Sequence, residues 1–510
     1  MELIEGWQTL LQVDILLVLA LGVLVGLMLG ALPGLDATVG ISLLLPITYA
    51  LSPLNALVFF TALYSAAVFG GSITAILFRI PGSTEAIMTA VEGHHFTARG
   101  EAAQALGIAV LSSAIGGLVA CVGLYLATPI LAEAALRFGP AEYFALGVLG
   151  LSCISSISGG SQLKGLAAGL IGLLLGTVGL DSLTGAKRFD FGTTVLLNGI
   201  PLVPASIGLF AASEVLRRVL QRDTDLVRTA PGAPQRRIVL ALPRIADFLR
   251  LRWVVLRSSV VGLFIGILPG AGATTAGILS YSLQSKLSRD PAGFGKGKDE
   301  GLAAPEAANN AAAVGAMIPL LSLGIPGSAT TAVLIGAFMI HNLQPGPMLF
   351  VREPELVYGL FAGMTVVNVV IIALAFLLVR LFARLALLPY PVLATGILSV
   401  CVIGSLAYGD ADAAMVMLVF ACIGLALEAG GYPLAPVILG LVLAPIIEVS
   451  LRRALIMEDF DIVAVVSQPL AATILFAALA LLVGPWISRA VLALRAGRRG
   501  DTRPASNQGD

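Results

Sequence analysis

Four groups of small residues, most of them bearing hydroxyls, stand at or directly after Pro-Gly pairs in this sequence. In chain order they are Gly34 and Thr38; Gly82, Ser83 and Thr84; Gly270, Gly272, Thr274 and Thr275; and Gly327, Ser328, Thr330 and Thr331. A helix that begins at such a point offers free backbone amides and the positive end of its dipole, and hydroxyls add further donors. This chemistry suits a carboxylate, so we predict that these groups bind an organic anion.

A cation is expected near the same positions, because broken helix ends also present carbonyl and hydroxyl oxygens that coordinate sodium. Asp36 and Asn310 are the residues that we expect to bind the ion. Asn309 and Asn310 are also candidates for contact with the substrate, although hydrogen bonding between helices explains them equally well. Ser72 lies in a polar interruption of an apolar run and is predicted to line the same cavity.

The sequence lacks the residue patterns that metal binding, nucleotide binding or hydrolytic catalysis would require. The three histidines, His94, His95 and His341, have no metal-ligand spacing, and the four cysteines stand singly in apolar segments. The patterns of a phosphate-binding loop, a serine-hydrolase elbow and a zinc protease are all missing. We therefore expect no metal site, no organic cofactor and no enzymatic activity, and any uphill transport would depend on an ion gradient.

The helices that must position these groups are interrupted at repeated places. Pro33 and Pro269 lie 236 positions apart within matching motifs, and Pro81 and Pro326 lie 245 apart. Proline lacks a backbone donor and glycine admits conformations closed to other residues, so a Pro-Gly pair breaks an apolar helix. In a bilayer such a break is tolerated only where protein or a water-filled cavity covers it, which places the site inside the bundle. A kink without function is the alternative for any single pair.

The composition is that of a membrane protein. Hydrophobic residues make up 58% of the chain, charged residues 12%, and the mean hydropathy is +0.97. Runs such as 15–32, 106–127 and 356–378 compare with the about 20 apolar residues that a spanning helix needs. We predict an all-α polytopic protein of the lipid bilayer with ten to twelve transmembrane segments. The formal net charge of +0 gives no indication of a nucleic-acid partner.

The chain divides into two transmembrane repeats with a linker between them. We place the repeats at 1–220 and 251–450, a basic cytoplasmic linker at 221–250, a C-terminal transmembrane segment at 451–495 and a disordered cytoplasmic tail at 496–510. Arginines crowd the linker and the tail, which is typical of cytoplasmic segments. The first repeat follows an acidic flank and the second a basic one, and this difference favours inverted repeats over parallel ones.

Small residues recur at every fourth position ahead of two of the breaks. They are Gly22, Gly26, Gly30 and Gly34 in the first repeat, and Ser258, Gly262, Gly266 and Gly270 in the second. A spacing of four places them on one helix face, where another helix can approach closely. Because the stripe recurs in register, we predict a specific packing face rather than the ordinary abundance of glycine in membrane helices.

Eight motifs together resemble one known family. They are GGSITAIL (70–77), DSLTGAKRFDFG (181–192), IGLFA (207–211), LPGAGAT (268–274), FGKG (294–297), APEAANNA (304–311), LGIPGSATT (323–331) and HNLQPGP (341–347). The chain resembles, over residues 15–470, the large membrane subunit of the tripartite tricarboxylate transporters. That family commonly carries an uncharged residue where this chain has Asp36. Either Asp36 helps to hold the coupling ion, or the substrate lies nearer the break in the second repeat.

The resemblance implies partners and a substrate class. In the family the large subunit is a multi-pass protein of the bacterial inner membrane that works with a small membrane subunit and a periplasmic solute-binding protein. We therefore expect a permease subunit that imports a tricarboxylate such as citrate, or another organic carboxylate, by alternating access as a sodium symporter. An elevator-like motion is a further hypothesis. The alternatives are an anion channel, since broken helices also line channel filters, and a membrane receptor that does not transport.

Overall fold

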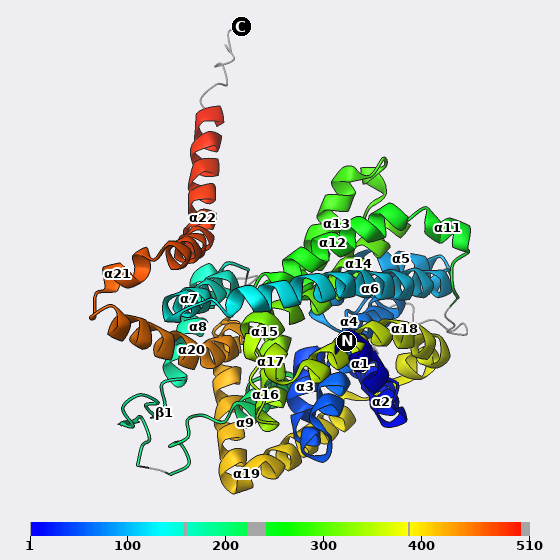
Figure 1. The fold of residues 1–510 in the computed structure, drawn as a ribbon. Helices are drawn as coiled ribbons and strands as arrows, with labels where there is room; N and C mark the ends of the chain where they lie inside the picture. The colour runs from blue at the N-terminus through cyan, green and yellow to red at the C-terminus, as the bar shows by residue number, and fades with distance from the viewer. Residues whose placement is uncertain (1, 158–160, 193, 222–240, 386–387, 501–510) are drawn as a thin grey trace.

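The computed structural model describes residues 2–157, 161–192, 194–221, 241–385 and 388–500. Over these residues the chain is a bundle of helices with one short antiparallel pair of strands in a loop, β1 (Gly179–Leu180) and β2 (Lys187–Arg188) (Figure 1). The fold is therefore helical, as the sequence predicts.

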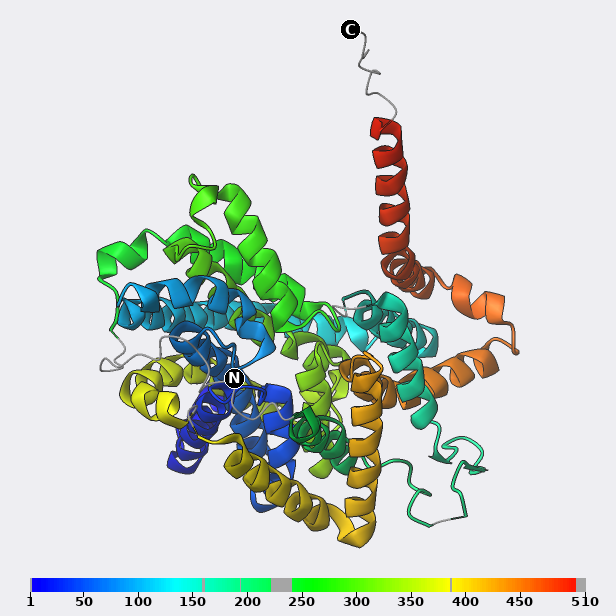
Figure 2. The ribbon, with the colours of Figure 1, turned by 180° about the vertical axis from the view of Figure 1, so that it is seen from behind.

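The first part of the chain contains α1 (Glu2–Leu10), α2 (Val13–Gly30), α3 (Ala37–Leu44), η1 (Leu45–Ala50), α4 (Pro53–Phe78), η2 (Thr84–Ala86), α5 (Ile87–Ala98), α6 (Ala102–Ala135), α7 (Pro140–Ile157), α8 (Gln162–Leu175), α9 (Leu202–Ser206), the π-helical η3 (Ile207–Ala212) and α10 (Ser213–Gln221). The second contains α11 (Ile245–Leu249), α12 (Arg252–Ile267), α13 (Gly272–Leu287), η4 (Pro291–Gly293), α14 (Asp299–Gly315), α15 (Met317–Leu323), α16 (Ala329–Ile340), α17 (Pro347–Arg352), α18 (Pro354–Leu385), α19 (Tyr390–Ala429) and α20 (Ala435–Met457). Two further helices follow, α21 (Ile462–Ser467) and α22 (Pro469–Gly500), and α22 projects away from the bundle in both views (Figure 1, Figure 2).

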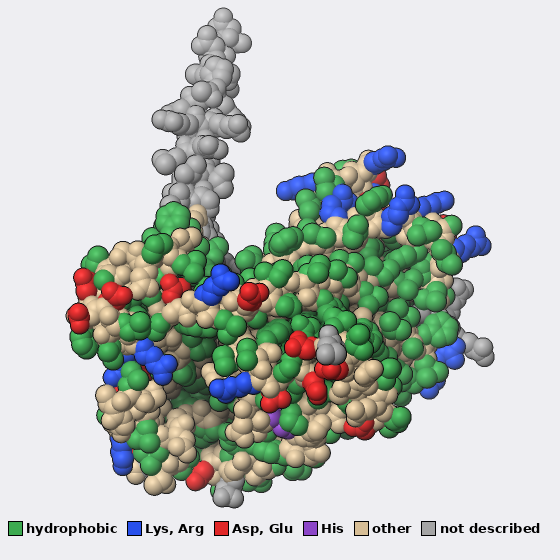
Figure 3. Space-filling model, in the orientation of Figure 1, with side chains coloured by type: hydrophobic (Ala, Val, Ile, Leu, Met, Phe, Trp, Pro, Cys, Tyr) green, Lys and Arg blue, Asp and Glu red, His purple; other side chains and the backbone are tan. Residues whose placement is uncertain are grey.

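Seven helices in the described ranges are long and apolar enough to cross a membrane. They are Val13–Gly30, Pro53–Phe78, Ala102–Ala135, Pro354–Leu385, Tyr390–Gly409, Ala411–Ala429 and Ala435–Met457, and four shorter apolar helices accompany them. Apolar side chains cover much of the surface in Figure 3, while Lys and Arg gather at the end where α11 to α13 lie. The protein is thus a multi-pass membrane protein, and the number of ten to twelve segments stays a prediction.

Helix α4 lies at the centre of the bundle. Its apolar span is entirely buried, and it packs against α2, α5, α6 and α18. A helix that is apolar or small-sided on every face, as this one is, belongs in an interior rather than at a boundary. The second break follows its C-terminal end, between α4 and η2.

The glycine stripes form packing faces in both halves. Added Cβ atoms would collide with backbone carbonyls of the facing helix at Gly26 with Leu63, Gly30 with Ala67, Gly262 with Ala308, and Gly266 with Ala312. The first two contacts join α2 to α4, and the last two join α12 to α14 at equivalent spacing. The predicted packing face is therefore confirmed, because only glycine lets the two backbones approach this closely.

A buried carboxylate explains the FGKG motif. Glu92 of α5 accepts hydrogen bonds from the backbone amides of Gly295, Gly297 and Lys298 at 2.6, 2.7 and 3.0 Å, and from the Tyr281 hydroxyl at 2.8 Å. Both glycines adopt positive φ, 77° and 86°, which turns their amides toward the carboxylate. The motif therefore holds the loop before α14 against the first half of the chain.

Part of the predicted linker and tail cannot be compared with the fold. Residues 222–240 and 501–510 lie outside the described residues. Within the described part, α11 occupies part of the predicted linker, and α22 continues past residue 496 to Gly500. The predicted start of the tail at residue 496 therefore does not coincide with the end of a helix.

Candidate functional site

Each of the four Pro-Gly pairs lies between two helices. The first, at Gly34, separates α2 from α3, and the second, at Gly82, separates α4 from η2. The third, at Gly270, separates α12 from α13, and the fourth, at Gly327, separates α15 from α16. Gly34 and Gly270 both adopt positive φ, 84° and 81°, a conformation that favours glycine. The predicted breaks are thus present in the structure.

The two breaks of each half are joined by a backbone hydrogen bond. The Gly34 amide donates to the Gly82 carbonyl at 3.1 Å, and the Gly270 amide donates to the Gly327 carbonyl at 2.8 Å. The Gly82 amide in turn donates to the Gly71 carbonyl of α4 at 3.1 Å. The sequence-based expectation of free amides is therefore wrong at Gly34, Gly82 and Gly270 in this conformation, because the breaks satisfy one another.

Threonine hydroxyls join the breaks of opposite halves. Thr38, after the first break, lies 2.9 Å from Thr330, after the fourth, measured between the Oγ1 atoms. The Thr274 hydroxyl, after the third break, donates to Thr84, after the second, at 3.1 Å. Together with the glycine hydrogen bonds, these pairs link the four breaks into a closed circuit, which we call the break ring. Residues nearly 300 positions apart in sequence thus meet at one place.

The remaining predicted hydroxyls differ in what they bind. Ser328 caps α16 in a reciprocal arrangement with Thr331, and its Oγ lies 3.3 Å from the Tyr64 hydroxyl of α4. Ser83 is buried, and its Oγ has no hydrogen-bond partner among the described residues. Thr275 is half-buried near the start of α13, where Gly272 has a φ of 67°. The Ser83 hydroxyl is therefore able to donate to a ligand, whereas the hydroxyls of Ser328 and Thr331 already take part in hydrogen bonds.

A cavity of 420 Å³ opens beside the first two breaks. Its lining includes Gly34, Asp36, Gly82, Ser83 and Thr84, together with residues of α10 and α19. Its size lies within the range of about 300–1,000 Å³ that is usual for small-molecule pockets. The Asp36 carboxylate caps α3 by accepting a hydrogen bond from the Val39 amide at 3.0 Å, so it occupies the helix end that was predicted for the anion.

Charged side chains from α10 and α19 complete the cavity wall. Glu214, Arg217 and Glu428 line it, and Arg217 pairs with both acids at 2.7 and 3.4 Å. Arg218 is buried, pairs with Glu214 at 2.5 Å, and its guanidinium packs against Gly34. Arg217 thus lines the cavity and Arg218 lies next to it at Gly34, and guanidinium groups bind carboxylates well.

Sequence reasoning missed these charged residues. It counted Arg217 and Arg218 among the arginines that crowd the central linker and gave Glu214 and Glu428 no role. The available signal was the IGLFA motif, which ends two residues before α10 and forms the π-helical turn η3. Such turns occur frequently at functional sites. The pairing of α10 with α19, however, depends on a contact across about 200 residues that no local pattern encodes.

The three polar residues predicted on α4 and α14 lie next to the break ring. Ser72 donates to Glu306 at 2.5 Å, and Asn309 donates to the Glu85 carbonyl at 3.4 Å. Asn310 is fully buried beside them on α14. Glu306 lies in the middle of α14, which begins at Asp299.

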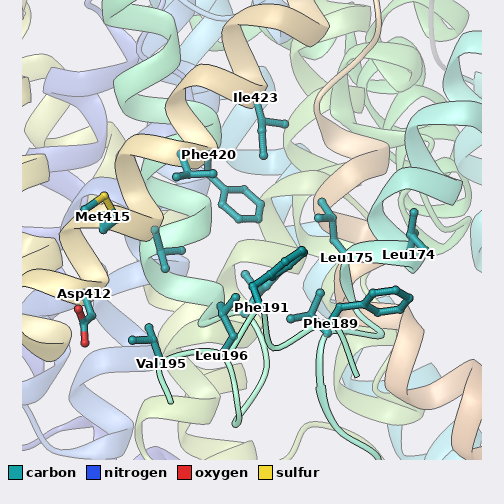
Figure 4. A pocket seen from close by; sticks show the side chains of 14 residues that line it. Leu174, Leu175, Phe189, Phe191, Val195, Leu196, Asp412, Met415, Phe420 and Ile423 are labelled. Atoms are coloured by element: carbon teal, nitrogen blue, oxygen red, sulfur yellow. The ribbon is translucent and has the colours of Figure 1, made fainter. Parts of the chain in front are cut away.

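A second cavity is larger, 530 Å³, but chemically different. It is lined mainly by apolar residues of α8, α19 and the loop after β2, and Figure 4 shows the rings of Phe189, Phe191 and Phe420 gathered around it. Asp412 is the charged residue at its edge. Such a surface offers no donors to an anion, so the smaller cavity at the breaks is the candidate substrate site.

Comparison with known proteins agrees with this architecture. The family model described as "Tripartite tricarboxylate transporter TctA family" matches residues 16–439, which includes all four breaks. The chain belongs to the tripartite tricarboxylate transporter TctA family. Members of this family are components of transporters rather than enzymes.

Two relatives from Agrobacterium vitis support the assignment. One is an uncharacterized 52.8 kDa protein of the TAR-I ttuC' 3' region, 40% identical over 463 residues that cover 91% of each chain. The other is an uncharacterized protein of the TAR-II ttuC' 3' region, 38% identical over 215 residues that cover 42% of this chain and 89% of the relative. No solved structure matches.

Proposed function

We propose that this TctA-family protein is the permease subunit of a sodium-coupled secondary transporter in the bacterial inner membrane. It imports a tricarboxylate or another organic carboxylate, which a periplasmic solute-binding protein delivers, and it works with a small membrane subunit. The substrate binds at the break ring and its cavity. The observation that carries the proposal is the closed circuit of four helix breaks, two from each half of the chain.

The break ring is suited to alternating access because its hydrogen bonds are individually weak and join the breaks to one another. Each backbone or hydroxyl hydrogen bond in it contributes only about 1 kcal/mol net, so substrate contacts are able to replace them. Thr38, Thr84, Thr274 and Thr330 then supply donors to the carboxylates, and Arg217 and Arg218 supply positive charge. We further propose that the two halves are repeats, since their glycine contacts and ring links recur at equivalent positions. The acidic flank before the first half and the basic flank before the second favour inverted repeats.

Coupling to a cation follows from the charges at the cavity. Asp36, Glu214 and Glu428 outnumber the two arginines, so a carboxylate substrate adds negative charge to a site that is already acidic. A sodium ion bound next to the break ring offsets that repulsion and makes anion and cation binding mutually favourable. Thermodynamic linkage of this kind is the requirement for symport.

The test is uptake of labelled citrate into proteoliposomes that contain the chain, the small subunit and the binding protein. An inward sodium gradient should drive accumulation above equilibrium, and a channel would only equilibrate the label. Thr38→Val and Thr330→Val should each lower the initial rate roughly tenfold or more, because a hydrogen bond to a charged group is worth about 1.5–3 kcal/mol.

Thr395→Val is the matched control, since Thr395 is exposed on α19 and its hydroxyl binds only a carbonyl of its own helix, that of Pro391, among the described contacts. Its uptake should equal that of the wild type. Unchanged rates in both ring variants would reject the break ring as the substrate site.

A further inference from the structure

Glu306 is a buried carboxylate that the proposed substrate site does not use. It is fully buried in α14, and it accepts hydrogen bonds from hydroxyls of three other helices. Ser72 of α4 donates to Oε1 at 2.5 Å, Ser113 of α6 donates to Oε2 at 2.7 Å, and Thr89 of α5 also donates to Oε1. The carboxylate thus joins α14 to three consecutive helices of the first half.

No ion pair compensates Glu306 within the described part of the chain. The titratable groups on the elements packed against α14 are Tyr64 on α4, Glu85 on η2, Glu92, His94 and His95 on α5, Cys121, Tyr125 and Glu133 on α6, Arg252 and Arg257 on α12, and Tyr281 and Lys286 on α13. None of their hydrogen bonds or ion pairs in the described residues reaches Glu306. A buried carboxylate without a counter-charge is costly, and hydroxyl donors alone do not neutralise it.

A second observation points to a ligand at the same place. Asn309 and Asn310 lie three and four residues after Glu306, so they share its face of α14. Both are fully buried, and the Asn309 Oδ1 and both polar atoms of the Asn310 amide have no hydrogen-bond partner among the described residues. Orphaned buried amides are rare in native proteins and indicate a missing partner. Carboxylate, hydroxyl and amide oxygens together are a hard donor set.

We propose that Glu306, with Ser72, Thr89, Ser113 and the adjacent asparagine amides, binds the coupling cation, a monovalent ion that is either sodium or a proton. Among the described residues, the first half of the chain has no acid at the matching position. The equivalent position in the first half, 245 residues earlier, is Thr61, whose hydroxyl binds carbonyls of its own helix. The two halves therefore differ at this position, which carries an acid in the second half and a threonine in the first.

The cation site is in contact with the break ring. The carbonyl of Gly71, next to Ser72, accepts the Gly82 amide of the second break, and the Asn309 amide donates to the Glu85 carbonyl just after it. Loss of the cation would leave the negative charge of Glu306 uncompensated between α4 and α14. The packing of these helices would then change, and the hydrogen bonds of the second break would weaken. Coupling of the cation site to the second break rests on the proposed function. Binding of the cation, by contrast, can be measured without transport.

The experiment measures the thermal unfolding midpoint of the full-length chain, purified in detergent. In the first arm, sodium chloride replaces choline chloride at constant ionic strength and pH 8. In the second arm, the pH falls from 8.5 to 5.5 in choline chloride. A ligand that binds only the folded state raises the midpoint saturably. The wild type should respond in the sodium arm if sodium is the ion, or in the pH arm if the proton is, and Glu306→Gln should abolish that response.

Glu133→Gln, which changes an exposed acid of α6, should respond as the wild type does. If Glu306→Gln does not fold, Ser113→Ala keeps the charge and removes one hydroxyl that donates to the carboxylate. It should raise the half-saturating sodium concentration severalfold. In the pH arm it should raise the pH at the midpoint of the response, because the charged carboxylate loses a hydrogen bond that stabilises it. Responses in Glu306→Gln or Ser113→Ala that equal those of the wild type would overturn the proposal.

Uptake assays distinguish a failure of the proposed cation site from a failure of the proposed transport function. Sodium-driven uptake that is unchanged in Glu306→Gln rejects the cation site and keeps the transporter. A cation response that disappears in Glu306→Gln, in a protein whose wild type moves no carboxylate, keeps the cation site and rejects the transporter.

Discussion

Glycine acts in two ways at the residue scale. At Gly34 and Gly270 it supplies a positive φ that ends a helix, and at Gly26 and Gly262 it removes the Cβ that would separate two helices. The second role is steric, so it depends on the facing backbone and not on the local conformation. Replacement by alanine separates the two effects, because alanine is favoured within a helix but occupies more space.

Gly26→Ala should destabilise the protein, although alanine is the better helix former. The new Cβ would meet the Leu63 carbonyl and the Ala66 side chain of α4, and such overpacking costs about 1–3 kcal/mol. Gly396→Ala, within the second turn of α19 and with nothing within 4 Å of its Cβ position, is the matched control and should be neutral or stabilising. Unfolding midpoints in detergent test this pair. Equal midpoints for the two variants would show that α2 and α4 separate easily.

At the element scale, two ion-paired residues fasten the loop between α8 and α9 to α20. Asp181 binds Arg452 and accepts backbone amides of the loop, and Arg188 pairs with Glu448 at 2.5 Å. The Arg452 guanidinium, followed by the amides of Leu183 and Thr184, holds the pKa of Asp181 well below its usual range. The loop carries β1 and β2 and supplies part of the lining of the apolar cavity in Figure 4, together with α8 and α19.

The pH dependence of this fastening follows from the direction of the pKa shift. A carboxyl whose folded pKa is lowered stabilises the fold fully above its unfolded pKa of about 3.9, and the contribution disappears as the pH falls through the lower folded pKa. The unfolding midpoint of the wild type should therefore exceed that of Asp181→Asn by a constant amount from pH 8 to about 5. The difference should shrink only below about pH 4. A difference that already declines between pH 7 and 5 would contradict the assignment.

At the scale of the whole molecule, a rocking form of alternating access moves the segments after the first and fourth breaks against each other, whereas an elevator-like motion carries them together. Gly336 of α16 lies against Leu45 of η1, with a Cβ position 3.3 Å from the leucine side chain and away from the break ring. These two positions belong to opposite halves of the chain. A covalent link between them therefore tests motion without altering a ring residue.

Leu45→Cys with Gly336→Cys, in a chain whose four native cysteines are replaced, should react with a short bifunctional thiol reagent and then lose citrate uptake. Each single-cysteine variant controls for modification alone and should keep its uptake after treatment. Crosslinked protein that transports at the rate of untreated protein would show that these segments stay together throughout the cycle, which argues against motion at this contact.

The sequence by itself determined the features that depend on local backbone chemistry. Pro33, Pro81, Pro269 and Pro326 interrupt helices because proline lacks a donor wherever it stands, and the spacing of four between glycines defines a smooth face on any helix. The apolar composition required a bilayer in the same way. These properties are carried by neighbours in the chain, so they are readable without the fold.

Only the tertiary structure decided how the breaks and charges meet. The Gly34 amide is not free because Gly82 lies beside it, Arg218 reaches Gly34 from the end of another helix, and Glu306 lies in mid-helix among three hydroxyls. Each of these facts depends on contacts between residues that are tens to hundreds of positions apart, and such contacts follow from the packing of whole helices. Asn310 was expected to bind the ion from the sequence, but the place of Glu306 in the proposed cation site emerged only from the fold, because the environment of a buried charge is set by its neighbours in space.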